Sequence, residues 1–194
     1  MPRYRTRSWR SFDPQSFAAR ATLPAAQAAA RLTILGIDPG SRRTGYGVIE
    51  CHQEGYTHVA HGCLNVASVD IALRLRRIFE GLGALIAEHR PAEVAVERVF
   101  VKRNVLAALK LGQARGAALC AVPPGTPVFE YAPSAIKLAL AGSGAAAKPQ
   151  VAHVMKALLC LTEVRSLDAS DALAVALCHA HHRVLAGLAG RAAP

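Results

Sequence analysis

The chain has 194 residues, of which 52% are hydrophobic and only 5% aromatic, with a formal net charge of +10. This length fits one domain with a core built mainly from Ala, Val, Leu and Ile, which excludes a disordered chain and a disulfide scaffold. No apolar run approaches the roughly 18 residues of a membrane span, so we expect a soluble, cytoplasmic protein without membrane contacts. The charge indicates a polyanionic partner.

Half of the net charge lies in residues 1–31, which carry six arginines and one aspartate. Strand or helix periodicity is lacking over most of this segment, so we predict a disordered basic extension. Three interpretations stay open: an arm that contacts phosphates, an Arg-rich targeting peptide, and an extension without a role. The segment lacks the apolar centre of a secretory signal, so export is not expected.

The ordered body opens with three strands. Residues 32–37 form a buried apolar run that stops at the turn sequence Asp38-Pro39-Gly40-Ser41, and strands at 44–50 and 56–66 follow. Because only short loops separate these strands, we expect an antiparallel meander.

Helices and strands then alternate along the rest of the chain. Helical periodicity is found at 70–89, 104–122, 133–141, 149–159 and 168–185, and short apolar strands at 93–97 and 128–131. This order predicts an α/β fold with a five-stranded mixed sheet flanked by helices over residues 32–185, and a flexible tail at 186–194.

The five cysteines are scattered, odd in number and without a Cys-x-x-Cys pair. This usage favours a reducing compartment and argues against a structural zinc site. The densest group of soft ligands is Cys178-His179-Ala180-His181-His182. Its place near the predicted end of the last helix favours histidines that complement the helix C-terminus over a metal site.

Acidic residues are scarce, and four of them fall where predicted elements begin or end. Asp38 and Glu97 each end an apolar strand, and Asp168 and Asp171 lie three apart on one face at the start of the last helix. If the first and fourth strands are neighbours, Asp38 and Glu97 meet at one sheet edge, to which the helix can add its pair. Taken singly, each acid also fits a turn, an exposed strand end or a helix start.

Four carboxylates in one pocket repel each other unless a cation neutralises them. Ligand sets made only of oxygen favour Mg²⁺ or Mn²⁺ over zinc, and two such ions about 4 Å apart suit hydrolysis of a phosphodiester. We therefore hypothesise a nuclease in which Asp38 bridges two ions and Glu97, Asp168 and Asp171 complete their shells. Its products would carry 5′-phosphate and 3′-hydroxyl ends.

The stretch 98–156 carries eight basic residues against one acid, Glu130. Such a surface beside an acidic pocket would hold phosphates, although a solvated basic face is the alternative. Phe100 precedes the basic pair Lys102-Arg103 and is either a core residue or a ring that stacks on or wedges between bases. The predicted DNA-binding residues are Phe100, Lys102, Arg103, Lys110, Arg115, Lys137 and Lys148.

These residues belong to a longer series of motifs. The series comprises Ile34-Leu35-Gly36-Ile37-Asp38-Pro39-Gly40-Ser41, Thr44-Gly45-Tyr46-Gly47, Glu97-Arg98-Val99-Phe100, Asn104, Ala108-Leu109-Lys110-Leu111-Gly112-Gln113-Ala114-Arg115-Gly116, Val128-Phe129-Glu130-Tyr131, Lys137, Lys148 and Asp168-Ala169-Ser170-Asp171-Ala172-Leu173-Ala174. In order and spacing it resembles the RuvC family of Holliday-junction resolvases over residues 32–182. The extension before residue 32 and the Ala-rich stretch 142–147 depart from the usual family pattern.

The resemblance implies an RNase H-like fold, a homodimer and Mg²⁺-dependent paired nicking of four-way DNA junctions. It assigns the metal-binding catalytic carboxylates to Asp38, Glu97, Asp168 and Asp171, and the ring inserted at the junction to Phe100. Lys137 and Lys148 match basic positions linked to catalysis or DNA contact. The resemblance also implies a branch-migration partner, the RuvAB complex.

Two other functions stay open, a nuclease acting on RNA–DNA hybrids and a junction-binding protein with a decayed site. An actin-like phosphotransferase is excluded because the body has no room for a second lobe. Gly112 and Gly116 lie four apart on one helix face, which predicts close helix approach at a dimer interface or within the core.

Overall fold

The computed structural model describes residues 31–67, 70–98 and 105–191. Three of the predicted DNA-binding residues, Phe100, Lys102 and Arg103, lie outside these ranges, so their roles remain predictions.

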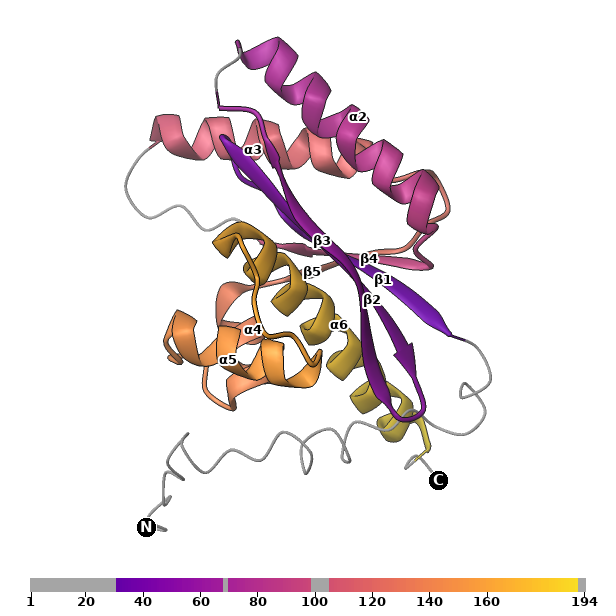
Figure 1. Cartoon of the computed structure of the whole chain (residues 1–194). Helices are drawn as coiled ribbons and strands as arrows, with labels where there is room; N and C mark the ends of the chain where they lie inside the picture. Colours follow the sequence, from indigo (N-terminus) through magenta and orange to yellow (C-terminus); the bar gives the residue numbers. More distant parts are fainter. Residues whose placement is uncertain (1–30, 68–69, 99–104, 192–194) are drawn as a thin grey trace.

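Five strands form one mixed sheet in the order β3-β2-β1-β4-β5 (Figure 1). They are β1 (Leu32–Asp38), β2 (Arg43–His52), β3 (Gly55–Asn65), β4 (Glu93–Glu97) and β5 (Val128–Tyr131). The first three strands pair antiparallel, whereas β4 runs parallel to β1 and β5 parallel to β4. The predicted meander and the predicted five-stranded mixed sheet are therefore confirmed.

Helices cover both faces of the sheet (Figure 1). They are α2 (Ile71–His89), α3 (Val105–Cys120), α4 (Pro133–Ala141), α5 (Lys148–Leu158) and α6 (Leu167–Arg191). In β1, Leu35 and Ile37 pack into the core beneath α2 and α3, and Ile34 packs into the core beneath α4, α5 and α6. Because side chains alternate along a strand, Asp38 shares the α6 face with Ile34.

Helix α6 lies directly against the sheet and is buried at every residue from Ala172 to His181. A side chain at Gly36 of β1 would place its Cβ 2.1 Å from the backbone oxygen of Ala172. Only glycine permits this approach, so β1 and the backbone of α6 touch directly. The start of α6 is thereby held over the edge of the sheet where Asp38 lies.

The last helix is longer than predicted, because α6 continues past residue 185 to Arg191. Residues 186–191, which were expected to belong to the tail, are therefore helical. Residues 186–193 contain no proline, and the two glycines in this stretch cost a helix only about 1 kcal/mol each.

The histidines of the 178–182 cluster consequently lie within α6 and not at its C-terminus. His179 Nε2 lies 2.6 Å from Glu93 Oε2, and its Nδ1 lies 2.7 Å from the Tyr131 hydroxyl. The role predicted for these histidines at the helix end was wrong, since His179 instead joins α6 to β4 and β5. In the ranges that the structure covers, no helix is long and apolar enough to cross a bilayer.

Candidate active site

Asp38 and Glu97 lie side by side at the carboxyl ends of the neighbouring strands β1 and β4, which we call the site edge of the sheet. Strands β1 and β4 are parallel neighbours with Ile37 opposite Val96, so the next residue on each strand is an acid. The adjacency predicted from the two strand ends is therefore confirmed. The two carboxyl groups share a hydrogen bond, which requires that one of them carry a proton.

Burial raises the pKa of Asp38 to about 8, and the charges of Glu97, Asp171 and Asp168 act in the same direction. Burial also raises the pKa of Glu97, although its hydrogen bond from Asp38 opposes that change. In the metal-free protein, burial and the charges of the neighbouring acids both favour the protonated form of Asp38, which then donates a hydrogen bond to Glu97. Without a cation, the four carboxyl groups of this cluster cannot all be ionised together.

Asp168 and Asp171 reach this edge from the first two turns of α6. The Lys148 Nζ lies 2.5 Å from Oδ2 of Asp171 and partly neutralises it. Asp168 accepts hydrogen bonds on its own Oδ2 from the Ser166 hydroxyl at 3.3 Å and from the Cys63 thiol at 3.8 Å. The structure thus brings the four predicted carboxylates close enough together that the charges of the other three raise the pKa of Asp38.

Among the residues that the structure describes, no three His, Cys, Asp or Glu side chains already form a metal-ligand group. The donor set nevertheless fits a hard divalent cation, because it consists of carboxylate oxygens and contains two acids that share a proton. A cation would take over the neutralising role now held by that proton and by Lys148. A metal ion would therefore have to displace Lys148 from Asp171 or share the carboxylate with it.

A pocket of about 60 Å³ opens beside the acids. It is lined by Glu97, Pro133, Ile136, Lys137, Lys148, Val151, Asp171 and Ala174. The volume is enough for water or a small ion. Helices α4 and α5 thus place the predicted basic residues Lys137 and Lys148 beside the acids, where a phosphate group can meet both charges.

Two other predicted DNA-binding residues lie elsewhere, on α3. Lys110 is exposed, whereas Arg115 pairs with Glu130 of β5. Glu130 also lies 3.5 Å from Arg98, the residue directly after Glu97. Through Glu130, these ion pairs connect α3 to β5 and to the residue that follows β4. Arg115 therefore already has an ionic partner within the protein.

Sequence reasoning did not single out four residues at this edge. Cys63 and Ser166 contact Asp168, and Arg42 and Arg43 are exposed in and after the turn that follows Asp38. The arginines were detectable, because they lie within five residues of a predicted catalytic acid. Cys63 was not, since its position depends on how β3 pairs with β2.

Comparisons with known proteins agree with this geometry. A family model described as "Crossover junction endodeoxyribonuclease RuvC" matches residues 34–179. A relative of that name from Halorhodospira halophila is 59% identical over 152 residues, which cover 77% of this chain and 90% of the relative.

Two solved structures of Thermus thermophilus RuvC, one of them in complex with a Holliday junction substrate, each match with a TM-score of 0.75 and 34% identity. The match covers 80% of this chain and 98% or 97% of the respective solved chain. This agreement confirms the predicted RNase H-like fold. The chain belongs to the RuvC family of crossover junction endodeoxyribonucleases.

Proposed function

We propose that this protein is a structure-specific endodeoxyribonuclease that resolves four-way DNA junctions by paired, metal-dependent nicks in recombination and repair. The observation that carries the proposal is the meeting of Asp38, Glu97, Asp168 and Asp171 at one sheet edge, beside a pocket with two lysines. The relative named above is a crossover junction endodeoxyribonuclease by name, and one solved neighbour is in complex with a Holliday junction substrate.

The four carboxylates would hold Mg²⁺, with Mn²⁺ as a substitute, and two ions per site suit their number. When bound, the ions supply an activated water and stabilise charge on the leaving 3′ oxygen, giving 5′-phosphate and 3′-hydroxyl ends. Lys137 and Lys148 line the same pocket and would bind the scissile phosphate. The exposed Arg42 and Arg43 would contact neighbouring phosphates.

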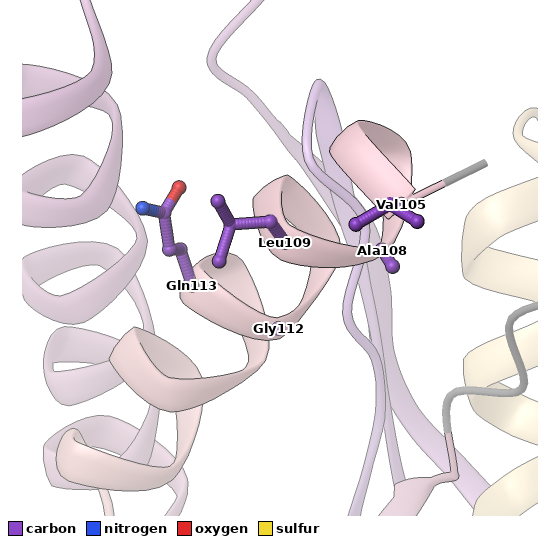
Figure 2. Close-up of a pocket in the computed structure, with 5 residues that line it drawn as sticks. All are labelled: Val105, Ala108, Leu109, Gly112 and Gln113. Carbon is purple, nitrogen blue, oxygen red and sulfur yellow. The ribbon is translucent and has the colours of Figure 1, made fainter.

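A homodimer is part of the proposal, and the exposed face of α3 supports it. Val105, Leu106 and Leu109 are 80%, 69% and 59% exposed, which is unusual for large apolar side chains on one helix. Figure 2 shows Val105, Ala108, Leu109, Gly112 and Gln113 following one another along α3, and these five residues line a shallow, open depression. A two-fold dimer would present two sites to a two-fold junction, as paired nicking requires.

Gly112 and Gly116 belong to the same helix, and among the described residues no atom beyond that helix's own nearby backbone and the adjacent residues lies within 4 Å of a Cβ built at either position. Close packing within the core, one of the two roles predicted for these glycines, is therefore wrong. Approach of a partner helix is the role that remains, and it fits the proposed dimer.

The family resemblance also suggests the RuvAB branch-migration complex as a partner. A cytoplasmic location is consistent with the five cysteines, all of which are free. A decayed junction-binding protein is less well supported, because all four acids and both pocket lysines are in place.

Asp171→Asn tests the catalytic assignment, because it keeps the shape of the side chain and removes its charge. We expect loss of junction nicking in Mg²⁺ and junction binding close to that of the unaltered protein, measured by gel shift without metal. Unchanged nicking would contradict the proposed site.

A further inference from the structure

The candidate site continues across the sheet beyond its acids. Asp38 of β1 lies opposite Gly45 of β2, and Gly45 lies opposite Cys63 of β3. Residues directly opposite each other on paired strands point to the same face of the sheet. Asp38, Gly45 and Cys63 therefore form one row on the α6 face, which we call the edge row.

Gly45 leaves a gap in the middle of the edge row, and the start of α6 fills it. A Cβ at Gly45 would lie 2.0 Å from the backbone oxygen of Asp168 and 2.4 Å from its carbonyl carbon. No other residue type could occupy this position without moving the helix. The gap sets Asp168 between Asp38 on one side and Cys63 on the other.

Two neutral donors meet the Asp168 carboxylate there. The Cys63 thiol lies 3.8 Å from Oδ2, within the range of a hydrogen bond from sulfur, and the Ser166 hydroxyl lies 3.3 Å from the same oxygen. Asp171 in the next turn is paired with the cation of Lys148 instead. Neutral donors fix the direction of a carboxylate without cancelling its charge.

We infer that Cys63 and Ser166 are positioning residues for Asp168, which hold its Oδ2 and so orient the carboxylate to bind a divalent cation together with Asp38. This inference rests on the proposed function, because it assigns the two residues to the metal site of that nuclease. It places one determinant of the site on β3, two strands away from the strand that carries Asp38.

The test compares Cys63→Ala, which removes the donor, with Cys63→Ser, which restores one of similar size. Ser166→Ala removes the second donor, and Cys120→Ala, at an exposed cysteine on α3, is the matched control. Calorimetric titration of each protein with Mn²⁺ alone, without DNA, measures metal affinity directly. Half-saturating Mg²⁺ for nicking, junction binding without metal and melting temperature are measured in parallel.

We expect Cys63→Ala and Ser166→Ala each to weaken Mn²⁺ binding and to raise half-saturating Mg²⁺ by about 3- to 10-fold, the effect of losing one modest hydrogen bond to a ligand. Cys63→Ser should lie within about 2-fold of the unaltered protein, by the same reasoning. Cys120→Ala should match it as well. Junction binding should not change in any variant.

Unchanged metal affinity in Cys63→Ala and Ser166→Ala would overturn the inference. Equal weakening in Cys63→Ala and Cys63→Ser, with a matching fall in melting temperature, would show a packing role and overturn it too. Failure of the unaltered protein to cut a junction at any metal concentration would instead overturn the proposed function, so the two failures are distinguishable.

Discussion

Lys148 Nζ lies 2.5 Å from Oδ2 of Asp171, a contact that joins the start of α5 to the second turn of α6 across the pocket. The hydrogen bond to Asp171 raises the pKa of Lys148, so the lysine stays charged at physiological pH. One carboxylate of the site is thus neutralised by a cation that belongs to the protein. A divalent ion at Asp171 would meet the positive charge of Lys148, which opposes its binding.

This competition predicts opposite effects of Lys148→Met on metal binding and on nicking. Without DNA, the variant should bind Mn²⁺ several-fold more tightly, because Asp171 no longer has an alternative cation. Nicking of a junction at saturating Mg²⁺ should fall by 10-fold or more, on the order expected when a charged contact to the phosphate is lost. Calorimetry and a single-turnover nicking assay measure the two effects.

Lys156→Met, at a lysine on α5 away from the pocket lining, is the control and should change neither quantity. Weaker metal binding in Lys148→Met would show that the lysine supports the ion and does not compete with it.

The pKa of about 8 for Asp38 predicts how stability changes with pH in the metal-free protein. Between its unfolded pKa near 4 and this folded value, the folded state holds a proton that the unfolded state has lost. Stability should therefore fall as pH rises through this window, by at most about 1.4 kcal/mol per pH unit for one proton. Glu97, whose pKa is also raised, contributes in the same direction.

His58, His179 and His181 act in the opposite direction, since burial lowers the pKa of all three, but their effect fades once pH rises above the unfolded histidine pKa of about 6.5. The range from about pH 7 to 8 therefore reports mainly on the acids. We expect the free energy of unfolding in EDTA to fall across this range, and Asp38→Asn to flatten the fall. Stability that rises across the range in the unaltered protein would contradict the buried, protonated state of Asp38.

The exposed face of α3 predicts that Leu109→Glu disrupts the dimer. A central apolar contact is commonly worth about 2 kcal/mol, so the dimer dissociation constant should rise by about 30-fold or more. Leu185→Glu on α6 is the matched control, because Leu185 is 61% exposed and Leu109 is 59% exposed. Sedimentation velocity over a range of concentrations should show dissociation only for Leu109→Glu. Identical behaviour of the two variants would place the interface elsewhere.

Removal of residues 1–31 tests whether the basic extension contributes to DNA binding. We expect the shortened protein to nick junctions as well as the full chain does, since all four acids lie beyond the cut. The slope of log affinity against log salt should stay the same if the extension makes no phosphate contacts. Each lost phosphate contact would reduce the magnitude of that slope by about 0.9. A slope reduced by several such steps would show that the extension contacts the DNA backbone.

The two strand acids could be placed from sequence because Asp38 and Glu97 each end an apolar run, and parallel neighbours end at the same edge. The place of Cys63 could not be predicted in this way. It lies opposite Gly45 only because the β2–β3 register shifts between Val48 and Ile49, and no residue pattern marks that irregularity. The pairing of Lys148 with Asp171 likewise depends on how α5 packs beside α6, which is a tertiary relationship.

A substrate panel in Mg²⁺ tests the central claim most directly. It comprises a four-way junction, a linear duplex of the same sequence and an RNA–DNA hybrid, each incubated with the full chain and with Asp171→Asn. We predict symmetric paired nicks in the junction, with neither of the other substrates cut at a comparable rate and no cutting by the variant. Preferential cutting of the hybrid, or nicks that persist in Asp171→Asn, would contradict a junction resolvase built on these four carboxylates.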